Sequence, residues 1–107
     1  MYIKRVKFER TGGFAGIRLA ADIELDEMPK DQREEILELL DDMDFDELPK
    51  HLTGKSNVAD GFNYSITVES DKGEHTVTAD ESAIPKKMDP LLEMLTKIAR
   101  QQARNKK

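Results

Sequence analysis

Residues 9–16 read Glu-Arg-Thr-Gly-Gly-Phe-Ala-Gly, and they separate two stretches in which apolar and polar residues alternate. Before them, residues 2–10 place Val6 and Phe8 on one face, as expected for a strand with one buried side. After them, residues 17–25 alternate apolar and polar with a period of two, which is the clearest strand pattern in the sequence. The two stretches therefore predict a long antiparallel hairpin around which the rest of the chain is organised.

The connection of this hairpin, residues 11–16, is longer than a simple turn requires, because two residues such as Asn-Gly suffice. Its three glycines permit positive φ angles and the close approach of another backbone. At its tip stands Phe14, a large apolar side chain with no evident place in the core. Two interpretations stay open: Phe14 folds back over the end of the sheet, or the loop is presented to enter the cleft of another protein.

A second hairpin is predicted from residues 62–69 and 75–79, which alternate in the same way around the turn at residues 71–73. Helical spacing of apolar residues predicts one helix from Lys30 to about Met43 and another that follows Asp89, its N-cap. The order ββαββα predicts an α+β fold, with a four-stranded antiparallel sheet and both helices packed on one face.

The first strand contains one irregularity, because Lys4 interrupts the apolar face and Ile3 falls on the face opposite Val6. At 107 residues the chain is expected to form a single domain, residues 1–107. Its last residues, about 101–107, are predicted to be a frayed basic tail, because the apolar stripe of the second helix ends near Arg100.

The composition narrows the function classes. Cysteine is absent, so the chain has no disulfide framework, no thiol nucleophile and no Cys-based zinc site. The N-terminal residues contain no run that resembles a signal peptide, and no stretch approaches the length of a membrane span. These features lead us to expect a cytoplasmic protein that does not associate with membranes.

The charge is unevenly distributed along the chain. Residues 22–47 hold thirteen Asp or Glu against Lys30 and Arg33, whereas residues 86–107 hold seven Lys or Arg against two acidic residues. An acidic middle argues against a nucleic-acid-binding protein, which needs a continuous basic face. The basic C-terminal residues are expected to complement the dipole of the second helix rather than to form a site.

No constellation of residues in the sequence indicates catalysis or metal binding. The two histidines, His51 and His75, are not spaced as metal ligands, and His75 is interpreted as a half-buried structural residue of its strand. Residues 42–46 resemble the start of a calcium loop, but Glu47 stands where glycine is needed and Thr53 where Glu is needed. We therefore expect no catalytic residue, no metal site and no cofactor.

The chain resembles the emfourin-type inhibitors of thermolysin-like, protealysin-like (M4) metallopeptidases, a bacterial family. The resemblance depends on residues 9–16, close to the family's Glu-Arg-Ser-Gly-Gly-Phe-Ala-Gly, with Thr11 in place of the usual serine. Weaker matches follow in the family's order; they are Asp44-Phe45, Leu48-Pro49, Phe62-Asn63-Tyr64, Ile66-Thr67-Val68 and Pro90-Leu91-Leu92.

This resemblance implies a non-enzymatic, metal-free protein, expected as a monomer, whose partner is a thermolysin-like zinc metallopeptidase. The expected contact residues are Arg10, Thr11, Gly12, Gly13, Phe14, Ala15 and Gly16, with Phe14 filling the apolar pocket that such enzymes offer beside the scissile bond. A second loop, Ser82, Ala83, Ile84 and Pro85, is expected to add contacts from the same end of the molecule. The alternative is a protein-interaction module that binds through its acidic helix, with Glu34, Glu38 and Asp41, or through its sheet face.

Overall fold

The computed structural model describes residues 3–12, 18–52 and 62–105. Its strands and helices occur in the order β1 (Ile3–Gly12), β2 (Leu19–Glu24), α1 (Lys30–Asp42), β3 (His51–Leu52), β4 (Phe62–Ser70), β5 (Gly73–Asp80) and α2 (Asp89–Asn105). Short 3-10 turns lie between them, at Leu25–Glu27, Phe45–Glu47, Glu81–Ala83 and Lys86–Met88. None of the helices in these three ranges is long and apolar enough to cross a bilayer.

The strands form one mixed sheet in the order β2-β1-β4-β5-β3. The first four are antiparallel neighbours, as predicted, whereas β3 pairs with β5 in parallel through His51↔Thr78 and Leu52↔Ala79. The prediction of a four-stranded, purely antiparallel sheet is therefore wrong in this detail. A strand of two residues shows no alternation, so only its pairing with a distant segment defines it.

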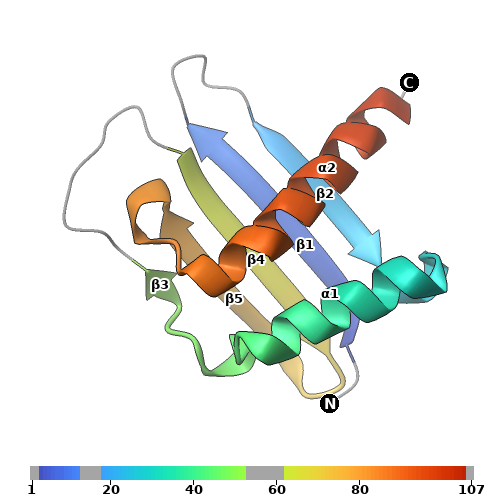
Figure 1. The fold of residues 1–107 in the computed structure, drawn as a ribbon, viewed down its shortest axis with the longest axis horizontal. Helices are drawn as coiled ribbons and strands as arrows, with labels where there is room; N and C mark the ends of the chain where they lie inside the picture. The colour runs from blue at the N-terminus through green and yellow to red at the C-terminus, as the bar shows by residue number, and fades with distance from the viewer. Residues whose placement is uncertain (1–2, 13–17, 53–61, 106–107) are drawn as a thin grey trace.

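Both helices lie against the same face of the sheet (Figure 1). The strand side chains that point toward them are buried, among them Val6, Phe8, Ile66 and Val77. From the helices, Ile36, Leu91 and Leu95 close this core, each with no exposed surface. The apolar side chains at every second strand position thus pack against the apolar side of α1 and α2 and form a single layer.

A β-bulge explains the irregularity at the start of β1. The register of β1 against β4 shifts between Ile3, which pairs with Ser70, and Arg5, which pairs with Glu69. Lys4 is the extra residue and is exposed, whereas Ile3 packs against the core. The placement of Ile3 on the face opposite Val6 is therefore wrong, because the bulge turns it to the helix side.

The far face of the sheet carries charged and hydroxyl side chains. Arg5 forms ion pairs with Asp22, at 3.2 Å, and with Glu24, and Lys7 lies 3.3 Å from Glu69. The hydrogen bond from Arg5 lowers the pKa of the Glu24 carboxyl, while the pKa of Arg5 is raised by the same bond. Side chains as exposed as these contribute little to the free energy of folding.

Helix α1 spans nearly the predicted range, while α2 differs from the prediction at its first residue. Asp89 is already helical, with φ −53° and ψ −48°, and follows a 3-10 turn, so it is not the extended N-cap that the Asp-Pro pair predicts. At the other end the helix continues to Asn105. There the side chain of Gln102 accepts a hydrogen bond from the amide of Asp22 and donates one to its carbonyl, at 3.2 and 3.1 Å.

Candidate partner-binding site at the glycine-rich end of the sheet

The glycine-rich connection leaves the sheet at the end of β1. Gly12 is the last residue of β1, pairs with Phe62 at the start of β4 and has φ 95°, in the region that favours glycine. Of the predicted contact residues, Arg10, Thr11 and Gly12 are thus strand residues held in the sheet. Gly13, Phe14, Ala15 and Gly16 lie outside the described residues, so the two interpretations of Phe14 stay predictions.

The base of this connection is held from both strands. Pairing of β1 with β2 ends at Arg10↔Leu19, while pairing of β1 with β4 continues to Gly12. Immediately before β2, Arg18 donates hydrogen bonds from Nε and Nη2 to Oε2 of Glu9, at 3.0 and 2.7 Å. This charge-assisted contact joins the two ends of the connection and fixes where they enter and leave the sheet.

Arg10 is packed among aromatic rings on the helix side of the sheet. Its guanidinium carbon lies 4.4 Å from the centroid of the Phe62 ring, a cation–π geometry. The Phe62 ring lies 6.4 Å from Tyr64, which in turn lies 6.3 Å from Phe8. Nε of Arg10 is buried and has no hydrogen-bond partner within the described part of the chain. The sequence predicted Phe62 and Tyr64 as strand residues only; their role in orienting Arg10 depends on the register of β1 and β4.

A hollow of about 820 Å³ lies beside Arg10, between the end of the sheet and α2. Tyr64, Ile84 and Leu92 give it an apolar part. The rest of its lining is charged or polar and comes from the turn after β5 and from α2; these residues are Glu81, Asp89, Glu93, Thr96, Lys97, Arg100, Gln101 and Arg104. The hollow therefore presents both signs of charge around a small apolar surface.

The second predicted loop leaves the sheet at the same end as the first. Asp80, the last residue of β5, pairs with Asn63, next to the pair of Phe62 with Gly12 (Figure 1). The segment Ser82 to Pro85 follows at once, as a 3-10 turn and the two residues after it. Ala83, Ile84 and Pro85 are partly buried, and Ile84 packs against the core, so part of this loop supports the fold.

The histidines have structural surroundings. His75 is half-buried, as predicted; its Nε2 lies 3.0 Å from the carbonyl oxygen of Leu48, and its ring meets Phe45 edge-on at 5.5 Å. Nδ1 of His51 lies 2.7 Å from the hydroxyl of Thr78. No group of acidic or histidine side chains that could hold a metal ion occurs among residues 3–12, 18–52 and 62–105.

The chain is similar to a known family and to a solved structure. The sequence model of the Emfourin family matches residues 8–96, and no curated protein matches the chain. Among solved structures, emfourin (M4in) from Serratia proteamaculans, described as an M4 family peptidase inhibitor, is similar at 18% identity, with a TM-score of 0.48. The similarity covers 87% of each chain. The family match includes both ends of the sheet and the first half of α2.

Proposed function

Because the match extends over most of its length, the chain belongs to the Emfourin family, and we propose that it is a protein inhibitor of a thermolysin-like (M4) zinc metallopeptidase rather than an enzyme. The observation that carries this proposal is the family match over residues 8–96, which includes the glycine-rich connection.

In the proposed mechanism, the Gly-Gly-Phe segment enters the active-site cleft of the peptidase and Phe14 fills an apolar pocket beside the scissile position. The sheet supports this role by holding the strand ends on either side of the segment, through Gly12↔Phe62 pairing and the contact of Arg18 with Glu9. A loop whose ends are already fixed loses less conformational freedom on binding, and this favours affinity.

Side chains beside the segment would enlarge the contact. Arg10 and Thr11 lie directly before it, and Arg10 is held in one orientation by Phe62. The turn at Ser82 to Pro85 lies at the same end of the sheet, so we propose that its exposed parts touch the rim of the cleft. Because part of it packs in the core, its contribution should be smaller than that of Phe14.

The second candidate, an interaction module that binds through its acidic helix, also has an observation in its favour. Glu34, Glu38 and Asp41 are exposed on α1. Helix α1 lies toward the end of the sheet that is opposite the end of β1 (Figure 1). This candidate predicts that changing α1 abolishes partner binding while changing Phe14 does not.

The decisive experiment is a titration of a thermolysin-like peptidase with the protein, following hydrolysis of a peptide substrate. We expect loss of activity at a 1:1 ratio with the inhibitor monomeric and uncleaved by mass spectrometry. Phe14→Ala should raise the inhibition constant by about 30-fold or more, as expected for an aromatic residue at the centre of an interface. Circular dichroism should show an unchanged fold.

The matched control is Glu38→Gln on α1, which should leave the inhibition constant within about twofold of the original. If Phe14→Ala inhibits as well as the unchanged protein, the mechanism through the loop is wrong. If Glu38→Gln and Asp41→Asn weaken the inhibition instead, the contact lies on α1 and the second candidate replaces the first.

A further inference from the structure

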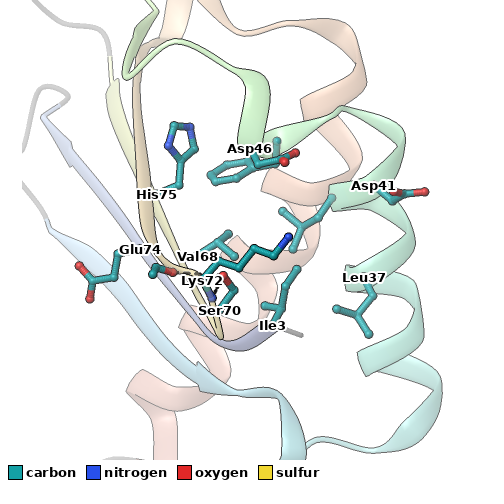
Figure 2. A pocket seen from close by; sticks show the side chains of 12 residues that line it. Ile3, Leu37, Asp41, Asp46, Val68, Ser70, Lys72, Glu74 and His75 are labelled. Atoms are coloured by element: carbon teal, nitrogen blue, oxygen red, sulfur yellow. Dashed lines mark hydrogen bonds between the residues drawn. The ribbon is translucent and has the colours of Figure 1, made fainter. Parts of the chain in front are cut away.

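A second hollow, of about 460 Å³, lies at the opposite end of the sheet, between α1 and the turn that joins β4 to β5 (Figure 2). Its floor is formed by Leu40, Phe45 and Val68, all buried. Ile3 and Leu37 form its walls and are only partly buried. Its volume falls within the range of about 300–1,000 Å³ that is typical of ligand sites.

The walls of this hollow are fixed by several independent contacts. The turn between β4 and β5 is closed by hydrogen bonds of the Ser70 hydroxyl with the Gly73 carbonyl and the Lys72 amide, both 3.2 Å. Phe45 is positioned by the edge of the His75 ring, which is itself bonded to the carbonyl of Leu48. A hollow with walls held in this way needs little rearrangement to receive an apolar group.

The mouth of the hollow is mostly acidic. Asp41 and Asp46 line it and are exposed, against one cation, Lys72, whereas the side chain of Glu74 points to the far face of the sheet, opposite Glu69 in the pairing of β4 with β5 (Figure 2). Figure 2 shows Lys72 reaching from the turn toward α1, the side on which Asp41 lies. Acidic residues continue along α1, since Glu38 precedes Asp41 by three positions and so lies on the same side of the helix.

We propose that this hollow is a second docking site, which binds a segment of another protein with one aliphatic side chain flanked by lysine or arginine residues. The aliphatic side chain enters between Leu37 and Phe45, and the flanking cations meet Asp41 and Asp46. Because the acidic residues extend along α1 beyond the hollow, an extended chain with several cations fits them better than a compact ligand with one charge.

The site is distant from the glycine-rich end. Strand β4 runs from Phe62, beside Gly12, to Ser70, beside the hollow, and at about 3.3 Å per residue these ends lie about 26 Å apart. One partner bound at each end would therefore not collide near the sheet. The docking site does not depend on the inhibitory role and can be tested without a peptidase.

The test is a titration of the isotope-labelled protein with the peptide acetyl-Lys-Lys-Leu-Lys-Lys-amide, followed by NMR. We expect saturable shifts of the amide signals of Leu37, Leu40, Phe45 and His75, with signals near Gly12 unchanged. Replacing the peptide's leucine by serine should weaken binding by about tenfold, the loss expected when one buried aliphatic side chain is removed. A peptide with glutamates in place of lysines should not bind.

Charge variants of the protein give a sharper test than peptide variants, because removing an acidic residue and removing Lys72 should change the dissociation constant in opposite directions. Asp41→Asn with Asp46→Asn should raise the dissociation constant by about fivefold at low salt. Lys72→Ala removes the single cation at the mouth and should lower the dissociation constant by about twofold. The matched control is Asp31→Asn with Glu35→Gln, which removes the same charge from residues that do not line the hollow and should change binding by less than about twofold.

Three results would overturn the proposal. The first is the absence of saturable shifts at the hollow up to millimolar peptide. The second is equal binding of the leucine and serine peptides, which would mean that the acidic surface attracts cations without an apolar site. The third is weaker binding by Lys72→Ala, which would show that Lys72 itself holds the ligand and that the preferred group is an anion.

Discussion

The two ends of the sheet are made by the same antiparallel strands, yet they differ in what closes them. At one end β1 continues along β4 to Gly12, and the stacking of Arg10 on Phe62 and the hydrogen bonds of Arg18 with Glu9 lie beside the exit of the glycine-rich connection. At the other end a tight turn, the β1 bulge and α1 enclose apolar side chains beneath an acidic rim.

This difference separates the structural requirements of the two ends. The glycine-rich end depends on backbone conformation and on oriented polar groups, which contribute little to folding but determine what is presented to a partner. The hollow at the other end is lined by residues of the core itself, so its shape cannot change without a change in stability. Variants that change the free energy of unfolding without changing the inhibition constant, or the reverse, can therefore test whether the two ends are independent.

The largest effect is expected from Phe45→Ala. Phe45 is only 4% exposed and contacts the ring of His75, so its truncation should lower the free energy of unfolding by about 3–5 kcal/mol. Chemical denaturation measures this loss. Peptidase inhibition by the folded protein should stay unchanged, because Phe45 lies far from Gly12 along the sheet.

If Phe45→Ala does not fold, Phe45→Leu provides the same test at a cost of about 1.5 kcal/mol or less. A rise in the inhibition constant that exceeds the change in the folded fraction would contradict the independence of the two ends.

A middle-sized effect is expected from a matched pair of glycines, one at each end. Gly12 has φ 95° and Gly73 has φ 122°, so Gly12→Ala and Gly73→Ala should each lower the free energy of unfolding by about 1–3 kcal/mol. An added Cβ at Gly73 meets no atom within 4 Å, so its cost is purely conformational. Only Gly12→Ala should also raise the inhibition constant, by about tenfold, because it changes the course of the chain into the presented segment.

Measured inhibition constants, corrected for the folded fraction, distinguish the two glycines. An equal rise in the inhibition constant of both variants would mean that the weaker inhibition reflects general destabilisation. Gly12 would then have no specific role in presenting the loop.

The smallest effect concerns pH. The hydrogen bond from Arg5 holds the pKa of Glu24 below its usual value, so Glu24 stabilises the fold above the ordinary Glu pKa of about 4.3, and this stabilisation is lost as the pH falls through its lowered pKa. Glu27 acts in the opposite sense, because its hydrogen bond with Glu24 raises its pKa and favours the protonated form in the folded state. The two contributions should partly cancel.

Denaturation curves at a series of acidic pH values check this balance. Glu27→Gln should make the loss of stability in acid steeper, since only the contribution of Glu24 then remains, and added salt should reduce the difference because these groups are exposed. A shallower loss in this variant would show that Glu27 has its pKa lowered rather than raised.

Much of the fold follows from local patterns in the sequence. Residues 17–25 and 62–69 alternate between apolar and polar, and the strands β2 (Leu19–Glu24) and β4 (Phe62–Ser70) lie there, in the predicted hairpins. Helix α1 covers nearly the predicted residues, because its apolar stripe at Ile36 and Leu40 is regular. The family was also indicated by the sequence, through the residues 9–16 that lie within the family match.

The errors have a common origin in contacts between distant residues. Strand β3 exists because the segment around His51 meets β5, and no period can be read from two residues. Ile3 reaches the core because of a bulge opposite Glu69 and Ser70.

The sequence by itself determined the four long strands, the two helices, the apolar face that joins them and the glycine-rich segment that places the chain in its family, because each of these is encoded by residues close together in the chain. Only the tertiary structure decided the stacking of Arg10 on Phe62, the common end of the two predicted loops and the acidic-rimmed hollow beneath α1. Each of these depends on the register and the packing of segments far apart in the sequence. Contacts of this kind produce no periodic pattern of residues within either segment, so the sequence alone does not reveal them.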